Sequence, residues 1–482
     1  MSNEQLKSFL PRTNTNQHEQ RQDAEKELVL VSEVRGKFLS LLLITYYLLF
    51  STVPLFAQSD DLEQTRLNTL KYGTETEIAA LIQTLKTESA DYLDNEIIKL
   101  VENTRNNKIV GGAFAFFSER EKPGLEARAL RAIEEREDEE NETVHAAIDY
   151  LGKIKAATAA PVFQKLLESG ERRFMNAAFR ALGQVGGNNK DETAEYLIDF
   201  YENRDAGNEN QRDIITAIGD TGSAKSVSFL AGLAADSETR PVLRIAALDA
   251  IAKIGDTAGL DAALACVSSK DPNIRAAAVT ALGPFSGANV DAAILDAFRD
   301  SFYKTRIAAA QASRQRKLAE AVPYLKFRAE RDDVPVVREE AIRALGAIAN
   351  SDANSILEEL FTARRNSDRV RIAAGEMIMQ NTPDSFLDTF IKEMDEAKQR
   401  NQNSLYNGLL KILGATKSSG LEAIARRLMQ DRGVTEKAVA LDIAANNGLN
   451  SLAQEIKTIA QEKNEGLSGK AKRTMEKLGI RE

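Results

Sequence analysis

A short motif recurs along this chain at nearly constant intervals. It reads roughly Arg-x-Ala-Ala-x-x-Ala-Leu-Gly and is clearest at 243–255, 274–286, 305–317, 337–349 and 370–382, with related stretches at 143–155, 174–186 and 211–222. Its arginine falls at Arg244, Arg275, Arg306, Arg338 and Arg371, so the intervals are 31, 31, 32 and 33 residues. A period of this size indicates supersecondary units that stack on one another, because one unit alone cannot bury its apolar face.

Each unit reads as two helices. The segments between the motifs carry apolar residues at helical spacing, as in Ile294, Leu295 and Phe298, and short turns rich in Asp, Asn, Gly and Ser separate them. The alternating pattern of a strand is absent from the sequence. We therefore predict an all-α fold, an α-solenoid of about a dozen helical pairs over residues 61–482. The low aromatic content of 6% suits thin helices that pack through alanine.

An aspartate stands shortly before the arginine in several repeats. Such an aspartate can cap the following helix, and the arginine can pair with the aspartate of its own or the neighbouring turn. Stacking would then turn these pairs into a structural ladder along the array. The predicted ladder residues are Asp271, Arg275, Asp300, Arg306, Asp333, Arg338, Asp368 and Arg371.

These stretches resemble the HEAT-repeat family in its shorter form. The resemblance rests on the aligned motifs, on Pro161 and Pro323 in the preceding helices, and on the turn aspartate with its arginine; it is clear over about 140–415. It implies that the second helix of each pair lines a concave face. The position five residues after the arginine is then expected to be exposed there: Asp149, Arg180, Thr216, Asp249, Thr280, Gln311, Arg343, Glu376 and Lys411.

A protein partner would bind this concave face. Acidic and basic residues balance at the exposed position, so no basic stripe for a nucleic acid is present. One residue after the arginine stand Ile245, Ile307 and Ile372, which could form an apolar patch for a partner or could instead face the next repeat. The predicted partner-binding residues are these three isoleucines together with Arg180 and Arg343.

One repeat departs from the motif. Where the others have Leu-Gly, it has Ser313-Arg314, followed by Arg316 and Lys317. The lost glycine and the added charges imply a local bend or a basic ligand site, and simple drift of the repeat would also account for them. We include Arg314, Arg316 and Lys317 among the candidate partner-binding residues.

The N-terminal part has the pattern of an export signal. Residues 38–59 carry no charge, Arg35 and Lys37 precede them, and Ala57 offers a cleavage position. Two interpretations of residues 38–57 stay open, a cleaved signal peptide and an uncleaved membrane anchor. Residues 1–37 are polar and are either untranslated, with a start near Val34, or a disordered tail. We expect the protein in the periplasm or cell envelope.

Composition argues against most chemistry. A single cysteine, Cys266, and two histidines provide neither a disulfide nor a Cys-ligated zinc site, and the net charge of −9 argues against general affinity for nucleic acid. We expect no catalytic residue, no cofactor and no metal. We predict that Cys266 is buried in the core and that His145 lies on the surface. The leading hypothesis is an exported, non-enzymatic scaffold that binds proteins. The alternatives are a membrane-anchored assembly scaffold and, since enzymes exist on this scaffold, a HEAT-like enzyme of the bilin lyase type.

Overall fold

The computed structural model describes the chain except for residues 1–54, 86–89, 187–188, 205–206, 208 and 482. The described residues form 26 α-helices and no strands, which confirms the predicted all-α class. The chain divides into two compact units, residues 1–120 and 121–482. The array expected over 61–482 therefore consists of two separately compact parts.

The first unit is a small helical cluster. Its described helices are α2 (Leu55–Tyr72), α3 (Glu75–Thr84), α4 (Asp94–Asn103) and α5 (Asn107–Glu119). Thr74 and Glu77 form a reciprocal capping box at the start of α3. Gly112 lies where an added Cβ atom would be 3.2 Å from Ile82. The absence of a side chain thus lets α5 approach α3.

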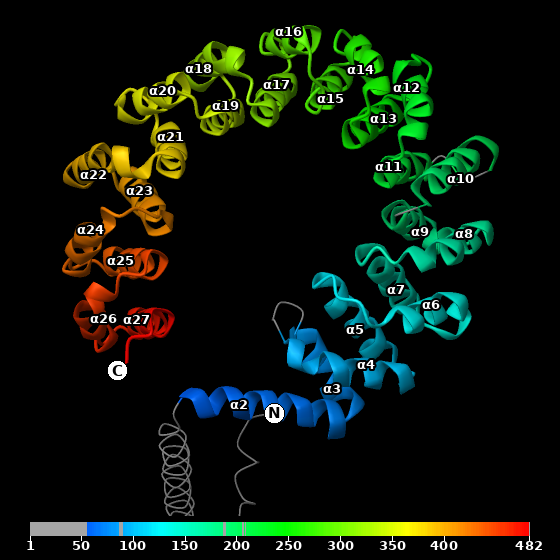
Figure 1. The fold of residues 1–482 in the computed structure, drawn as a ribbon, viewed down its shortest axis with the longest axis horizontal. Helices are drawn as coiled ribbons and strands as arrows, with labels where there is room; N and C mark the ends of the chain where they lie inside the picture. Colours follow the sequence, from blue (N-terminus) through cyan, green and yellow to red (C-terminus); the bar gives the residue numbers. More distant parts are fainter. Residues whose placement is uncertain (1–54, 86–89, 187–188, 205–206, 208, 482) are drawn as a thin grey trace, which may run out of the picture. The chain divides into compact units, whose positions relative to one another are not determined.

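The second unit consists of two layers of helices that alternate along the chain (Figure 1). The outer layer contains α6 (Glu126–Glu134), α8 (Ala160–Glu168), α10 (Lys190–Asn203), α12 (Val227–Ala235), α14 (Leu260–Cys266), α16 (Ala288–Ala297), α18 (Val322–Arg331), α20 (Ser351–Thr362), α22 (Pro383–Gln399), α24 (Leu421–Met429) and α26 (Ala453–Ala460). The inner layer contains α7 (Asn141–Lys153), α9 (Arg172–Val185), α11 (Gln211–Thr221), α13 (Pro241–Ile254), α15 (Pro272–Ala281), α17 (Tyr303–Arg316), α19 (Pro335–Ile348), α21 (Asp368–Asn381), α23 (Asn403–Ala415), α25 (Val434–Asn447) and α27 (Glu465–Leu478). The inner layer lines the concave side of the second unit, as the family resemblance implied.

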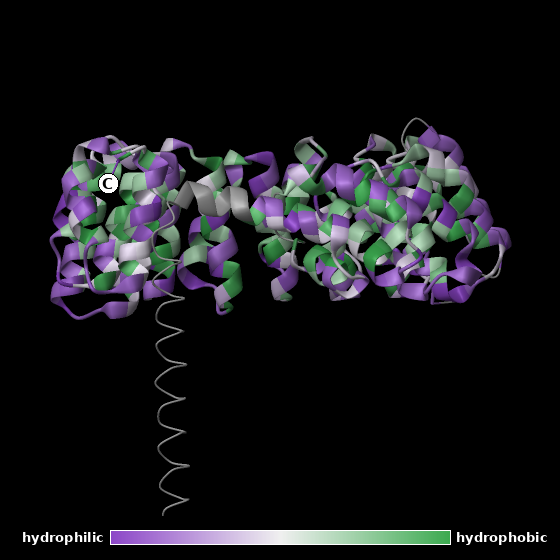
Figure 2. Cartoon of the chain, turned by 90° about the horizontal axis from the view of Figure 1, so that it is seen from below, coloured by the Kyte–Doolittle hydropathy of each residue, from purple (hydrophilic) through white to green (hydrophobic). Residues whose placement is uncertain are grey.

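Each inner helix packs against the next inner helix and against its outer partner. The glycine of the motif makes this close packing possible. A Cβ atom at Gly219 would lie 2.7 Å from the Cβ and 2.9 Å from the Cα of Ala250, and one at Gly183 would lie 2.6 Å from the carbonyl oxygen of Ala217. Because neighbouring inner helices approach through their backbones here, the motif requires a residue without a side chain. Figure 2 shows hydrophilic and hydrophobic residues interspersed along the helices, as expected where each helix buries one face.

The N-terminal predictions fall mostly on residues outside the described part of the chain. Residues 1–54 are not described, and residues 55–57 begin α2. Among the helices of the described residues, none is long and apolar enough to cross a membrane. The export signal, its cleavage and the polar segment 1–37 therefore stay predictions.

Candidate protein-binding surface

The motif arginines link neighbouring repeats through the turns that precede the inner helices. Arg275 donates to both carboxylate oxygens of Asp300, at 2.7 and 2.9 Å, and to the carbonyl oxygen of Ser269 at 2.9 Å. Asp300 also accepts from the backbone N–H of Phe302 at 2.7 Å. One arginine thus joins its own turn to the next turn, and the same carboxylate holds the backbone of the residue that precedes the next inner helix.

Arg306 repeats this arrangement one unit further along. It donates to both carboxylate oxygens of Asp332, each at 2.7 Å, and to the carbonyl oxygens of Asp300 and Ser301, each at 3.1 Å. Arg306 is 6% exposed and Asp332 is 1% exposed. The predicted residue Asp333 adds a single contact of 2.9 Å and is itself exposed. The motif predicted Asp333 and not Asp332, because it does not distinguish two adjacent aspartates.

We call Arg275, Asp300, Arg306, Asp332 and Arg338 the arginine ladder. It ends at Arg338, which donates to the carbonyl oxygen of Asp332. The turn after α20 has Ala363 at the place that Asp332 takes after α18, so Arg338 has no carboxylate there. The ladder is therefore shorter than the arginine spacing predicted.

The other predicted ladder residues are used differently. Arg371 reaches Glu393 of α22 at 2.7 Å and the carbonyl oxygen of Phe361 at 2.8 Å. Asp271 accepts from the N–H of Asn273 at 2.8 Å and so caps its own helix, α15. Asp368 is the first residue of α21 and not its N-cap, which is Ser367. Asp271 and Asp368 thus form no ion pair with a motif arginine among the described residues.

Further along, other side chains replace the arginine. Tyr406 stands at its position in α23, and Lys398 of α22 supplies the positive charge by binding Asp431 at 2.6 Å. In α25, Lys437 binds Glu462 at 2.6 Å, across the same 25-residue separation as Arg275 and Asp300. A spacing of 25 residues from cation to carboxylate was the signal in the sequence that could have found the pair of Lys437 and Glu462, whereas Lys398 and Asp431 lie 33 residues apart.

The ladder carboxylates are ionised at neutral pH. Burial opposes ionisation of Asp332, but hydrogen bonds from Arg306 and from the N–H of Val334 outweigh it and lower the pKa of this carboxyl. The hydrogen bonds from Arg275 likewise lower the pKa of Asp300. These carboxylates are paired with arginines of the same chain, so the ladder is a structural feature rather than a binding site.

The residues predicted to be exposed on the concave face do lie on the surface of the inner layer. All are exposed except Gln311, which is half-buried. Several of their charges are paired within the chain: Arg180 contacts Asp149 of the neighbouring inner helix at 3.2 Å, and Arg343 contacts Glu340 of its own helix at 3.1 Å. Asp249 is exposed, yet surrounding protein atoms reduce its solvation and raise its pKa, against the opposing effect of Arg212.

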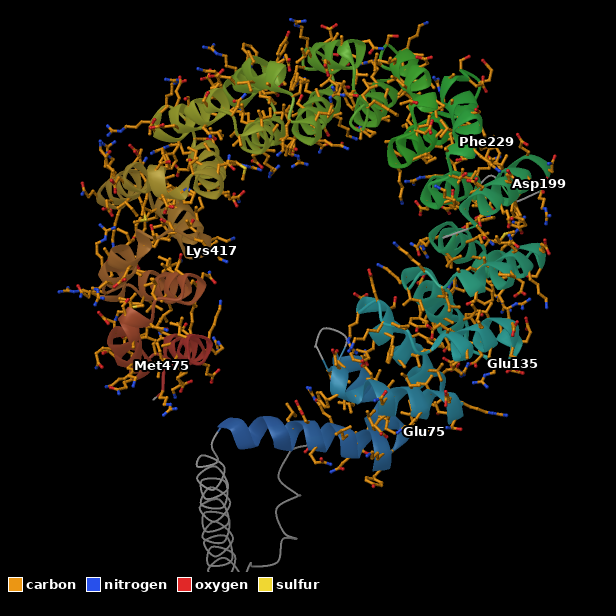
Figure 3. The ribbon with its side chains drawn as sticks, viewed as in Figure 1. Glu75, Glu135, Asp199, Phe229, Lys417 and Met475 are labelled. Atoms are coloured by element: carbon orange, nitrogen blue, oxygen red, sulfur yellow. The ribbon has the colours of Figure 1, made fainter. Side chains whose placement is uncertain are left out.

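A groove opens between inner helices α21 and α23, and we call it the concave groove. Its volume is about 490 Å³, within the range of ligand sites. Its lining is Ile372, Glu376, Met379, Gln380, Pro383, Gly408, Lys411, Ile412, Ala415, Thr416 and Lys417. Figure 3 shows Lys417 on the inner side of the helical array. The groove combines an apolar floor with charged residues at its edge.

The charges of the concave groove differ from others on the inner layer. Glu376, Lys411 and Lys417 are all exposed and form no ion pair within the described residues. On the neighbouring helix α25, by contrast, Asp442 is paired with Lys470 at 2.6 Å. Unpaired charges around an apolar floor are what a polar-rimmed binding surface presents to a partner.

The three isoleucines do not form one apolar patch. Ile245, Ile307 and Ile372 are half-buried, and the helices between them carry Ala276 and Glu339 at the same position. Ile372 packs over α23 at Gly408, where an added Cβ atom would overlap it. Ile372 therefore faces the next repeat and lines the concave groove at the same time.

The aberrant repeat places Arg314, Arg316 and Lys317 at the end of α17. Arg314 contacts Glu340 at 3.3 Å, and Arg316 is paired with Asp291. Lys317 adopts a left-handed conformation with φ of 50°. At the equivalent position after α13, the residue with this conformation is Gly255, with φ of 69°. Two of the three added charges are thus neutralised within the protein.

Cys266 and His145 serve packing. Cys266 is buried, as predicted, and its thiol donates to the carbonyl oxygen of Ala234 at 3.3 Å. His145 is half-buried instead of fully on the surface, because its ring packs edge-on against Phe174 with centroids 5.1 Å apart.

Two layers of paired helices, joined by a recurring arginine and a recurring close-packing glycine, define the second unit as an α-solenoid of the HEAT-repeat class. The sequence profile of the spirochaete HEAT repeat proteins matches residues 70–474. The chain belongs to this family.

Other comparisons concern the fold. No curated protein matches the chain. Among solved structures, karyopherin Kap121p is similar at a TM-score of 0.42 and 12% identity, covering 87% of this chain and 54% of Kap121p. The structure of Kap121p bound to the extreme C-terminus of the protein phosphatase Cdc14p is similar with a TM-score of 0.43 and 12% identity. The match covers 86% of this chain and 53% of Kap121p. This chain spans about half the length of these structures.

Proposed function

We propose that this chain is an exported, non-enzymatic scaffold that binds other proteins through the concave face of residues 121–482. The concave groove carries the proposal, because on the inner layer it combines an apolar floor with three charges that form no ion pair within the described residues. A partner segment would bury apolar side chains on Ile372 and Ile412, which are half-buried, and would pair with the charges at the edge.

The arginine ladder supports this role. Its hydrogen-bonded links fix inner helices α15, α17 and α19 relative to one another, and beside the concave groove Arg371 fixes α21 to α22 through Glu393. A surface held in this way loses little conformational freedom when a partner binds.

The test uses a photo-crosslinking amino acid placed in cells at Ala415, beside the concave groove, or at Glu358 on outer helix α20 as the control. We expect a discrete crosslinked product from Ala415 and none from Glu358. Ile412→Asp puts a carboxylate on the floor of the groove and should abolish the product, whereas Ile356→Asp on α20 should leave it. Equal crosslinking from both faces would contradict binding by the concave face.

Export is proposed on the uncharged segment 38–59 and the basic residues before it. The same segment is long enough to favour a second candidate, a scaffold anchored to the membrane by residues 38–57. A carbonate wash of isolated envelopes distinguishes the two. Release into the soluble fraction indicates cleavage, retention in the membrane pellet indicates an anchor, and recovery with cytoplasmic proteins would contradict export.

A further inference from the structure

The outer layer carries a second groove, where the end of α16 meets α18. Its volume is about 440 Å³, and we call it the aromatic groove. Its lining is Phe298, Arg299, Pro323, Tyr324, Phe327 and Arg328. Phe327 is 52% exposed, and among the phenylalanines from residue 62 onward no other is exposed. An exposed ring with aromatic and arginine neighbours has the composition of an interface hot spot.

The rings of the aromatic groove are already held in place. Phe298 and Tyr324 stack with centroids 5.7 Å apart and an interplanar angle of 27°. The Arg299 guanidinium lies 5.3 Å from the Tyr324 ring centroid, and that of Arg328 lies 5.2 Å from the Phe327 centroid. These contacts orient the rings without a ligand, so binding would require little further ordering.

The groove carries no free charge. Arg299 is paired with Asp296 at 2.9 Å, and Arg328 with Asp332 at 3.3 Å. A charged ligand would have to compete with these carboxylates, whereas an uncharged apolar ligand would not. Charge complementarity therefore favours a neutral occupant.

The polar groups of the groove define this occupant further. Arg299 is 64% exposed at its side chain and donates to the Tyr324 hydroxyl at 3.4 Å, so both groups have hydrogen-bonding capacity to spare at the mouth of the groove. A polyproline II segment has no internal hydrogen bonds and leaves its carbonyl oxygens free to accept. Its flat, apolar proline rings suit aromatic walls.

We propose that the aromatic groove binds an extended, proline-containing segment of a partner protein. Tyr324 and Phe327 lie three residues apart on α18, so they neighbour each other on one helix face. They would stack against successive proline rings, while Arg299 and the Tyr324 hydroxyl donate to backbone carbonyls. This site lies on the layer opposite the concave groove and does not depend on the function proposed there.

The test measures binding of a dye-labelled oligoproline peptide to the purified full chain in mild detergent, by fluorescence polarisation. A glycine–serine peptide of equal length is the comparison. We expect saturable binding of oligoproline alone. Phe327→Ala should weaken it about tenfold or more, as for a hot-spot aromatic residue. Val336→Ala removes a side chain of similar exposure, 45%, outside the groove and should leave binding unchanged within about twofold.

Phe327→Leu serves if Phe327→Ala does not fold, since it keeps an apolar side chain and removes the ring. It should weaken binding nearly as much as Phe327→Ala. Equal binding of the two peptides, an equal effect of Phe327→Ala and Val336→Ala, or the absence of saturable oligoproline binding would each overturn the proposal.

Discussion

Removing Arg306 is expected to destabilise the second unit far more than removing an exposed arginine of another inner helix. Arg306 makes five hydrogen bonds: two to Asp332, one to Asp333 and two to backbone carbonyls. Asp332 is 1% exposed, so Arg306→Met would leave its carboxylate buried without its main cationic partner. Breaking a buried ion pair from one side costs about 3–5 kcal/mol. We expect the lower end, about 3 kcal/mol, because Arg328 still lies 3.3 Å from Asp332.

Arg180→Met is the matched control. Arg180 also bridges two inner helices, but it has one contact of 3.2 Å with Asp149, and the two side chains are 57% and 51% exposed. Exposed pairs contribute below about 1 kcal/mol. The two variants thus lose the same type of side chain, and burial is the main difference between them.

The assay is native-state hydrogen exchange resolved by peptide mass spectrometry. A solenoid need not unfold in one step, so a local free energy of opening is better defined than a global one. Arg306→Met should lower the protection of α17 and α19, whereas Arg180→Met should change α7 and α9 little. The double variant Arg306→Met/Asp332→Leu removes the stranded charge and should regain at least about half of the loss. An Arg306→Met effect no larger than that of Arg180→Met would refute the reasoning.

Three further outcomes are expected. Gly219→Ala should lower the free energy of unfolding by about 1–3 kcal/mol, because the added Cβ atom would lie 2.7 Å from the Cβ atom of Ala250. Gly232→Ala, where the added atom meets open space, should raise the free energy of unfolding by up to about 1 kcal/mol. Similar thermal midpoints for the two variants would contradict this expectation. The lowered pKa of Asp332 stabilises the fold above the unfolded value of about 4, so acidification below that value should progressively remove the difference between the native chain and Arg306→Met. Burial raises the pKa of Tyr406 to about 12, helped by Glu436 and opposed by Lys398. Its stabilising effect, present below about pH 10, should be lost as pH rises towards 12, and Tyr406→Phe should reduce this alkaline loss in a pH-jump unfolding series.

Much of the concave face could be predicted from the sequence. The period of the motif placed the helical pairs, and the resemblance to HEAT repeats implied that residues five positions after the arginine, such as Asp149, Thr280 and Lys411, are exposed on the concave face, as they are. Exposure of a position on a helix depends on its angle around the axis, which the sequence spacing contains. The concave groove could not be predicted in the same way, because it depends on Gly408 leaving room beside Ile372 on another helix.

The sequence by itself determined the all-α class and the repeat, because these follow from spacing along one chain, and the resemblance to HEAT repeats supplied the order of inner and outer helices. The tertiary structure alone decided which carboxylate each arginine meets. Arg306 binds mainly Asp332 and not its neighbour Asp333, Arg338 pairs with no carboxylate of the described residues, and Arg371 binds Glu393. Those choices depend on how far one repeat is rotated and shifted against the next, and this displacement is set by close contacts between backbones, as at Gly219 and Ala250.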